Sequence, residues 1–131
     1  MLYLLIYILL AGNPVEVNNA WIRPAAKDAN TAMYCEIINN GNAADTLFNV
    51  TSNIARRTEI HETFKSGDMM GMRRVQNIVV KPKEKIYLQP GGMHIMLIGT
   101  ENEVKKGGQG EVSFHFKRAG IIKVKGFVKS N

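Results

Sequence analysis

Beyond residue 13, apolar residues come in short stretches, and no stretch keeps the three- or four-residue spacing of an amphipathic helix. The stretches are rich in Val, Ile, Phe and Tyr, and clusters of Gly, Asn, Pro and Lys separate them. The pattern predicts an all-β protein. The expected strands cover residues 15–23, 32–39, 46–53, 57–63, 69–75, 77–81, 84–89, 93–99, 110–117 and 121–128.

Turn-forming residues stand between these predicted strands. Examples are NNGNAAD at 39–45, QPGG at 89–92 and KKGGQG at 105–110, which supply glycine or proline where the chain must reverse. Many short strands without intervening helices are typical of a β-sandwich or a Greek-key barrel. A chain of 131 residues is long enough to bury one core. We therefore expect a single β-sandwich domain over residues 13–131.

Strict alternation in EVSFHFK, residues 111–117, places Val112, Phe114 and Phe116 on one face of a strand. His115 falls on the opposite face, where we expect it to be solvated.

The single cysteine, Cys35, excludes an internal disulfide, a Cys-x-x-Cys redox pair and a thiolate-rich zinc site. It shares its strand face with Met33 and Ile37, so we expect a small buried hydrophobe rather than a reactive thiol. Trp21 is also expected to lie in the core.

The N-terminus carries an unbroken apolar run over residues 2–11. It is shorter than the roughly 20 residues that span a bilayer, but it fits the apolar region of an export signal. Residues 1–12 are therefore predicted to be an export signal or its remnant, and the protein to be periplasmic. An uncleaved anchor, which would be the chain's only membrane contact, and a first core strand are the alternatives.

The formal net charge of +6 comes from lysines and arginines spread along the chain, without a long basic run or interleaved aromatic residues. We expect a solvated surface and no nucleic-acid partner; an acidic protein patch or anionic lipid head groups remain the alternative. The chain also lacks Gly-x-Ser-x-Gly, a complete His-Glu-x-x-His and a glycine-rich phosphate loop. We therefore predict no enzymatic activity.

Histidine and methionine supply the candidate chemistry. His94 and Met96 lie two apart in a predicted strand, so both project from one face. Further donors occur in HETFKSGDMMGM, and they are His61, Met69, Met70 and Met72. Imidazole and thioether groups favour Cu(I) over Mg²⁺, Ca²⁺ or Zn²⁺. The alternative is that the methionines fill the core and the histidines lie at a sheet rim.

The chain resembles the PCuAC family of periplasmic copper(I) chaperones, which are small cupredoxin-like β-sandwich domains. The similarity runs from Val15 to Val128. It rests on NNAWIRPA at 18–25, AMYCEIINNGNAAD at 32–45, TEIHET at 58–63, MMGMRRV at 69–75 and QPGGMHIMLIG at 89–99.

The family pattern joins a histidine, a downstream methionine, a gap of twenty-one residues and a closing His-x-Met; here residues 73–93 form that gap. The resemblance therefore implies that His61, Met72, His94 and Met96 bind one Cu(I). Three further methionines are possible substitutes, outer-shell groups or packing residues: Met69, Met70 and Met93.

The resemblance also implies a receiver for the copper, the copper centre of cytochrome c oxidase, reached directly or through a thiol-bearing assembly chaperone. We expect a monomer whose copper affinity falls on acidification below about pH 6.5, because a protonated imidazole cannot bind metal.

Two other functions are alternatives to copper delivery. An electron-transfer cupredoxin needs a thiolate beside histidine and methionine, and Cys35 has no such neighbours. The second is an exported, non-enzymatic interaction module whose Met-rich end docks a protein partner without metal.

Overall fold

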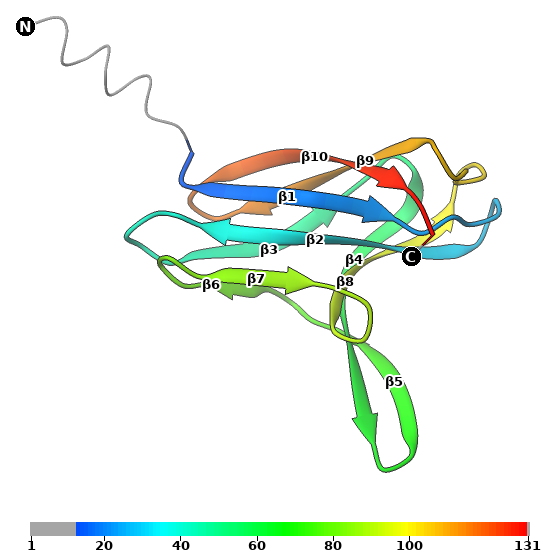
Figure 1. The fold of residues 1–131 in the computed structure, drawn as a ribbon, viewed down its shortest axis with the longest axis horizontal. Helices are drawn as coiled ribbons and strands as arrows, with labels where there is room; N and C mark the ends of the chain where they lie inside the picture. Colours follow the sequence, from blue (N-terminus) through cyan, green and yellow to red (C-terminus); the bar gives the residue numbers. More distant parts are fainter. Residues whose placement is uncertain (1–12, 131) are drawn as a thin grey trace, which may run out of the picture.

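The computed structural model describes residues 13–130, which form ten strands (Figure 1). They are β1 (Val15–Ile22), β2 (Asn30–Asn39), β3 (Asp45–Thr51), β4 (Ala55–Ser66), β5 (Met69–Arg74), β6 (Ile78–Val80), β7 (Lys85–Leu88), β8 (Met93–Thr100), β9 (Gln109–Phe116) and β10 (Gly120–Val128). Each predicted strand is present. The largest difference is at β4, which continues to Ser66 instead of ending at residue 63.

The predicted export signal, residues 1–12, lies outside the described residues. It stays a prediction, as does the boundary of the domain that follows it. Within residues 13–130, no helix is long and apolar enough to cross a bilayer.

The strands form one continuous hydrogen-bonded path in the order β5-β4-β8-β2-β1-β10-β9-β3-β6, and β7 pairs with β2. The β1–β10 pair is parallel, and its neighbours β1–β2 and β9–β10 are antiparallel. The strands other than β5 each have an apolar face that must be shielded from water, so the sheet curls around a common core. The predicted all-β, single-domain fold is confirmed.

Strand β9 shows the alternation that builds this core. Val112, Phe114 and Phe116 are buried, while the residues between them face outward. His115 lies on the outer face, with its Nε2 atom 3.0 Å from the Thr51 hydroxyl. The predicted faces of this strand are confirmed.

Cys35 is buried in β2 as a free thiol, on the same face as Met33 and Ile37. Burial raises the pKa of this thiol, and the charge of neighbouring Glu36 raises it further. The thiolate that reactive cysteines require is therefore suppressed, as predicted.

The prediction that Trp21 lies in the core is wrong. The β1–β2 register shifts between Asn18 and Trp21, and Asn19 has a φ of 56°. This bulge inserts a residue and reverses the alternation that began at Val15. Ile22 therefore takes the core position, and Trp21 lies half-buried on the outer face.

Strand β5 differs from the other strands because it contributes no residue to the core. It pairs only with β4, and the β4–β5 hairpin (residues 61–74) projects away from the sandwich (Figure 1). Any role for the side chains of β5 must therefore be sought at the surface.

Candidate metal centre

Two predicted ligands, His61 and His94, lie directly opposite each other on the antiparallel strands β4 and β8. Their ring centroids are 5.9 Å apart, with 52° between the ring planes. The adjacent pair, Ile60 and Ile95, is buried in the core. Because side chains alternate along a strand, the two imidazoles share the outer face of the sheet.

Each imidazole has one nitrogen with a hydrogen-bond partner and one without. His61 Nε2 lies 2.9 Å from the Glu59 carboxylate, and His94 Nδ1 lies 3.4 Å from the Gly92 carbonyl oxygen. Both partners are acceptors, so these nitrogens carry the protons. His61 Nδ1 and His94 Nε2 are buried without a partner. Their free lone pairs are suited to a metal ion.

The electrostatic setting keeps His94 neutral. Burial is the largest effect and lowers the pKa of His94; the hydrogen bond to the Gly92 carbonyl oxygen partly opposes it, and the positive charge of Arg23 lowers the pKa further. The pKa of Glu59 is also lowered, first by the hydrogen bond from His61 and then by Arg74 and Arg57. The site thus combines an ionised Glu59 carboxylate, which accepts the hydrogen bond from His61, with a His94 imidazole that retains its lone pair at neutral pH.

The predicted thioethers lie on the same face as the histidines. Met96 is opposite Glu59, and Met72 is opposite Thr63. Both are therefore diagonal neighbours of His61, a separation that long side chains can bridge. Met96 is half-buried, whereas 57% of Met72 is exposed.

Strand register separates the three additional methionines. Met93 lies opposite Glu62, on the face away from His61, and it packs against the core. Met69 is three positions from Met72 in β5, so alternation places it on the opposite face, the one that Met93 also occupies. Met70 shares the face of Met72 and is the additional thioether on the histidine side of the hairpin.

An aromatic wall, which was not predicted as part of the site, lies beside His94. The Tyr34 ring centroid is 6.2 Å from that of His94, and the ring centroids of Trp21 and Tyr34 are 4.8 Å apart. The Arg23 guanidinium lies 5.2 Å from the Tyr34 ring centroid. The aromatic rings cover this side of His94, which is buried.

Glu59 was also missed, although a signal for it was present. It precedes His61 by two positions in a strand, so it must share the histidine face.

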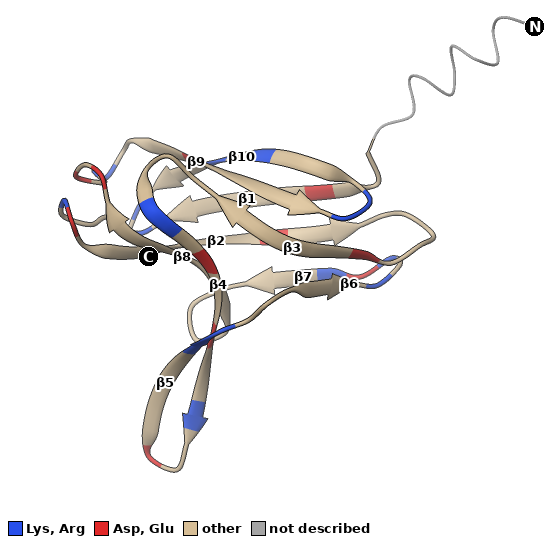
Figure 2. Cartoon of the chain, turned by 180° about the vertical axis from the view of Figure 1, so that it is seen from behind, with Lys and Arg blue, Asp and Glu red and all other residues tan. Residues whose placement is uncertain are grey.

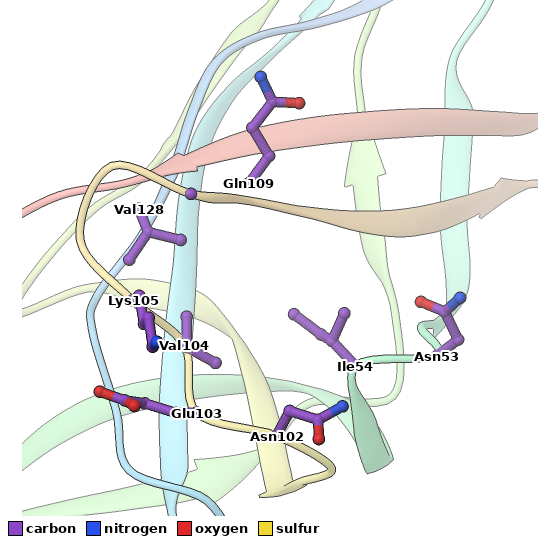
Figure 3. Close-up of a pocket in the computed structure, with 9 residues that line it drawn as sticks. Asn53, Ile54, Asn102, Glu103, Val104, Lys105, Gln109 and Val128 are labelled. Atoms are coloured by element: carbon purple, nitrogen blue, oxygen red, sulfur yellow. The ribbon is translucent and has the colours of Figure 1, made fainter.

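The pocket in Figure 3 is elsewhere. It has a volume of about 410 Å³ and is lined by loop residues and by Ile54, Val104 and Val128. None of the four predicted ligands borders it. The candidate centre is instead an outward-facing sheet surface.

Within residues 13–130, no three side chains of His, Cys, Asp or Glu gather closely enough to hold a metal ion. A centre at His61 and His94 would therefore need methionine sulfur to complete it. Such a donor set suits a soft, monovalent ion better than Zn²⁺, Mg²⁺ or Ca²⁺.

Comparison with protein families matches residues 15–128 to the family described as "Putative lipoprotein LpqE-like". The chain belongs to the LpqE-like family. Lipoproteins are exported to the cell envelope, so membership supports the predicted export. A relative from Leifsonia xyli subsp. xyli, "Putative lipoprotein Lxx21020", is 28% identical over 103 residues, covering 78% of this chain and 61% of the relative. The LpqE-like chain thus spans less than two thirds of that relative's length.

Solved structures confirm the resemblance to PCuAC domains. The copper-bound PCuAC domain of PmoF2 aligns with a TM-score of 0.76 and 21% identity, covering 92% of this chain and 97% of that domain. The Cu(I) form of DR1885 from Deinococcus radiodurans aligns with a TM-score of 0.67 and 24% identity, covering 88% of this chain and 79% of DR1885. At these identities the alignments show a shared fold.

Proposed function

We propose that this LpqE-like protein binds one Cu(I) through His61, Met72, His94 and Met96 in the periplasm and delivers it to an acceptor. The observation that carries the proposal is the pair of buried, unpartnered imidazole nitrogens on facing strands. Both rings have their other nitrogen engaged, so their free lone pairs are presented on one face. The copper-bound relatives share this fold.

The donor set explains why Cu(I) would be held and also released. Thioether and neutral imidazole groups stabilise the soft monovalent ion without the strong binding that thiolates provide. Met72 lies on the exposed hairpin, so an incoming ligand can attack before the other three donors leave. We propose transfer by such ligand exchange, without a catalytic step.

The proposed acceptor is the copper-containing subunit of cytochrome c oxidase, reached directly or through a thiol-bearing assembly chaperone. Acceptors with thiolates have stronger donors for Cu(I), so transfer to them is downhill. Lysine and arginine residues are spread over several strands and loops (Figure 2).

Titration of the purified, reduced protein with Cu(I) against a chromogenic Cu(I) chelator tests binding. We expect one Cu(I) per chain and competition with the chelator at neutral pH. Binding of Zn²⁺ in preference to Cu(I), or no competition with the chelator, would contradict the proposal.

A second function is favoured by the exposure of Met69, Met70 and Met72 on the hairpin. An exported interaction module would use these adaptable side chains to dock a protein partner without metal. Partner capture with and without a copper chelator separates the functions: a complex that survives chelation, from a protein that binds no Cu(I), supports docking.

Acidification should weaken both copper binding and the metal-free fold. Burial lowers the pKa of His94 below that of an unfolded histidine, so the unfolded chain takes up a proton first. The stability contributed by neutral His94 is fully present above about pH 6.5 and is lost as pH falls through the lowered folded pKa. Chelator competition and thermal unfolding between pH 7.5 and about pH 5 measure the two effects.

A His94→Asn variant is the control for the stability effect, because it keeps a polar side chain but removes this titration. Its unfolding temperature should depend less on pH over the same interval. An equal dependence in both proteins would assign the effect to other groups.

A further inference from the structure

The two faces of the β4–β5 hairpin are unlike. On the face away from the histidines, Phe64 lies opposite Gly71, and a Cβ added to Gly71 would be 2.8 Å from the tip of the ring. The Arg73 guanidinium lies 4.8 Å from the Phe64 ring centroid, and Arg73 Nε donates to Glu62 over 2.6 Å. The Phe64 ring, Gly71 and the ion pair thus fill the face of the hairpin away from the histidines, and the hairpin contributes no residue to the core.

The histidine face of the hairpin carries the thioethers. Met72 pairs with Thr63, and Met70 pairs with Lys65 one step farther from the sandwich. The two methionines are 57% and 63% exposed, and neither packs in the core. They form a row that leads outward from the facing histidines towards the hairpin turn.

We infer that Met70 is a hand-off ligand, which together with Met72 forms an outer Cu(I) position on the hairpin. The inference rests on the proposed function and adds a route by which copper leaves the centre. Residues two apart in a strand are separated by about 6.6 Å at Cα, and flexible methionine side chains can direct both sulfurs to one ion.

The step is a ligand exchange. Copper–nitrogen bonds to His61 and His94 and the copper–sulfur bond to Met96 break as a copper–sulfur bond to Met70 forms, while Met72 stays bound. The ion remains Cu(I), both imidazoles are released neutral, and no proton or electron is transferred. Lys65, opposite Met70, brings a positive charge to the outer position. Copper therefore rests at the histidines and occupies the outer position only in transit.

The matched variants are Met70→Leu and Met69→Leu, which remove exposed thioethers from opposite faces of the same strand. Copper transfer from each loaded protein to bathocuproine disulfonate is followed by stopped-flow absorbance. We expect Met70→Leu to slow second-order transfer roughly tenfold while the equilibrium affinity changes less than about threefold. Met69→Leu should leave both quantities unchanged.

Methyl NMR gives a second readout in a His94→Ala variant, in which the inner position is weakened. Titration with Ag(I), a redox-inert substitute for Cu(I), should shift the Met70 and Met72 methyl signals and leave Met69 unshifted. The signal of buried Met33 reports that the core is intact.

The outcomes separate this inference from the proposed function. Three results would overturn the hand-off role while leaving copper binding intact. They are copper transfer from Met70→Leu at the wild-type rate, a transfer rate that does not depend on chelator concentration, and a Met70 methyl signal that Ag(I) does not shift. Failure of the wild-type protein to bind Cu(I) would overturn both.

Discussion

A variant carrying both His94→Ala and Met96→Ala is expected to bind Cu(I) more than about a hundredfold more weakly than the wild type. The double change removes the unpartnered His94 Nε2 and the half-buried sulfur on the same face of β8. His61 and exposed Met72 would then remain as the donors. Competition with a chromogenic chelator at neutral pH measures the loss.

The matched control is His115→Ala with Met93→Leu. It removes the same residue types, but His115 lies on β9 and Met93 lies on the opposite face of β8. Its affinity should equal that of the wild type, and chemical denaturation of both variants checks that each is folded. Unchanged affinity in the His94→Ala, Met96→Ala variant would remove His94 and Met96 from the centre.

Glu59→Ala should weaken Cu(I) binding by about ten- to a hundredfold, although Glu59 is not proposed to touch the ion. Its carboxylate accepts the hydrogen bond from His61 Nε2. The proton therefore stays on Nε2, and Nδ1 keeps a free lone pair that can bind the ion. Without this partner, the imidazole can rotate or exchange its proton between the two nitrogens. The affinity of Glu59→Gln should lie closer to that of the wild type, because its amide oxygen can still accept the bond.

Glu62→Ala is the control for loss of a carboxylate from β4. Glu62 faces the other side of the strand and pairs with Arg73. It should retain wild-type affinity. If Glu59→Ala and Glu62→Ala behave alike, Glu59 acts only through surface charge, and its positioning role is wrong.

Most of the fold was predictable because it depends on local alternation. The buried positions of β9 and the interior thiol of Cys35 follow from counting every second residue. Alternation predicts the wrong face for Trp21, because the bulge after Asn18 adds a residue to β1 without a distinctive local signal. That change places Trp21 beside Tyr34 and the candidate centre instead of in the core.

By itself, the sequence determined that His94 and Met96 share a strand face and that the available donors are imidazoles and thioethers. Strand stereochemistry and side-chain chemistry act within a few residues, so these properties need no distant partner. Only the tertiary structure decided that His61 faces His94, that Met96 lies diagonal to His61, and that the hairpin places Met72 on the histidine face. Those relations depend on the register of separate strands, which is set by burying residues such as Ile60 and Ile95 together across the sheet.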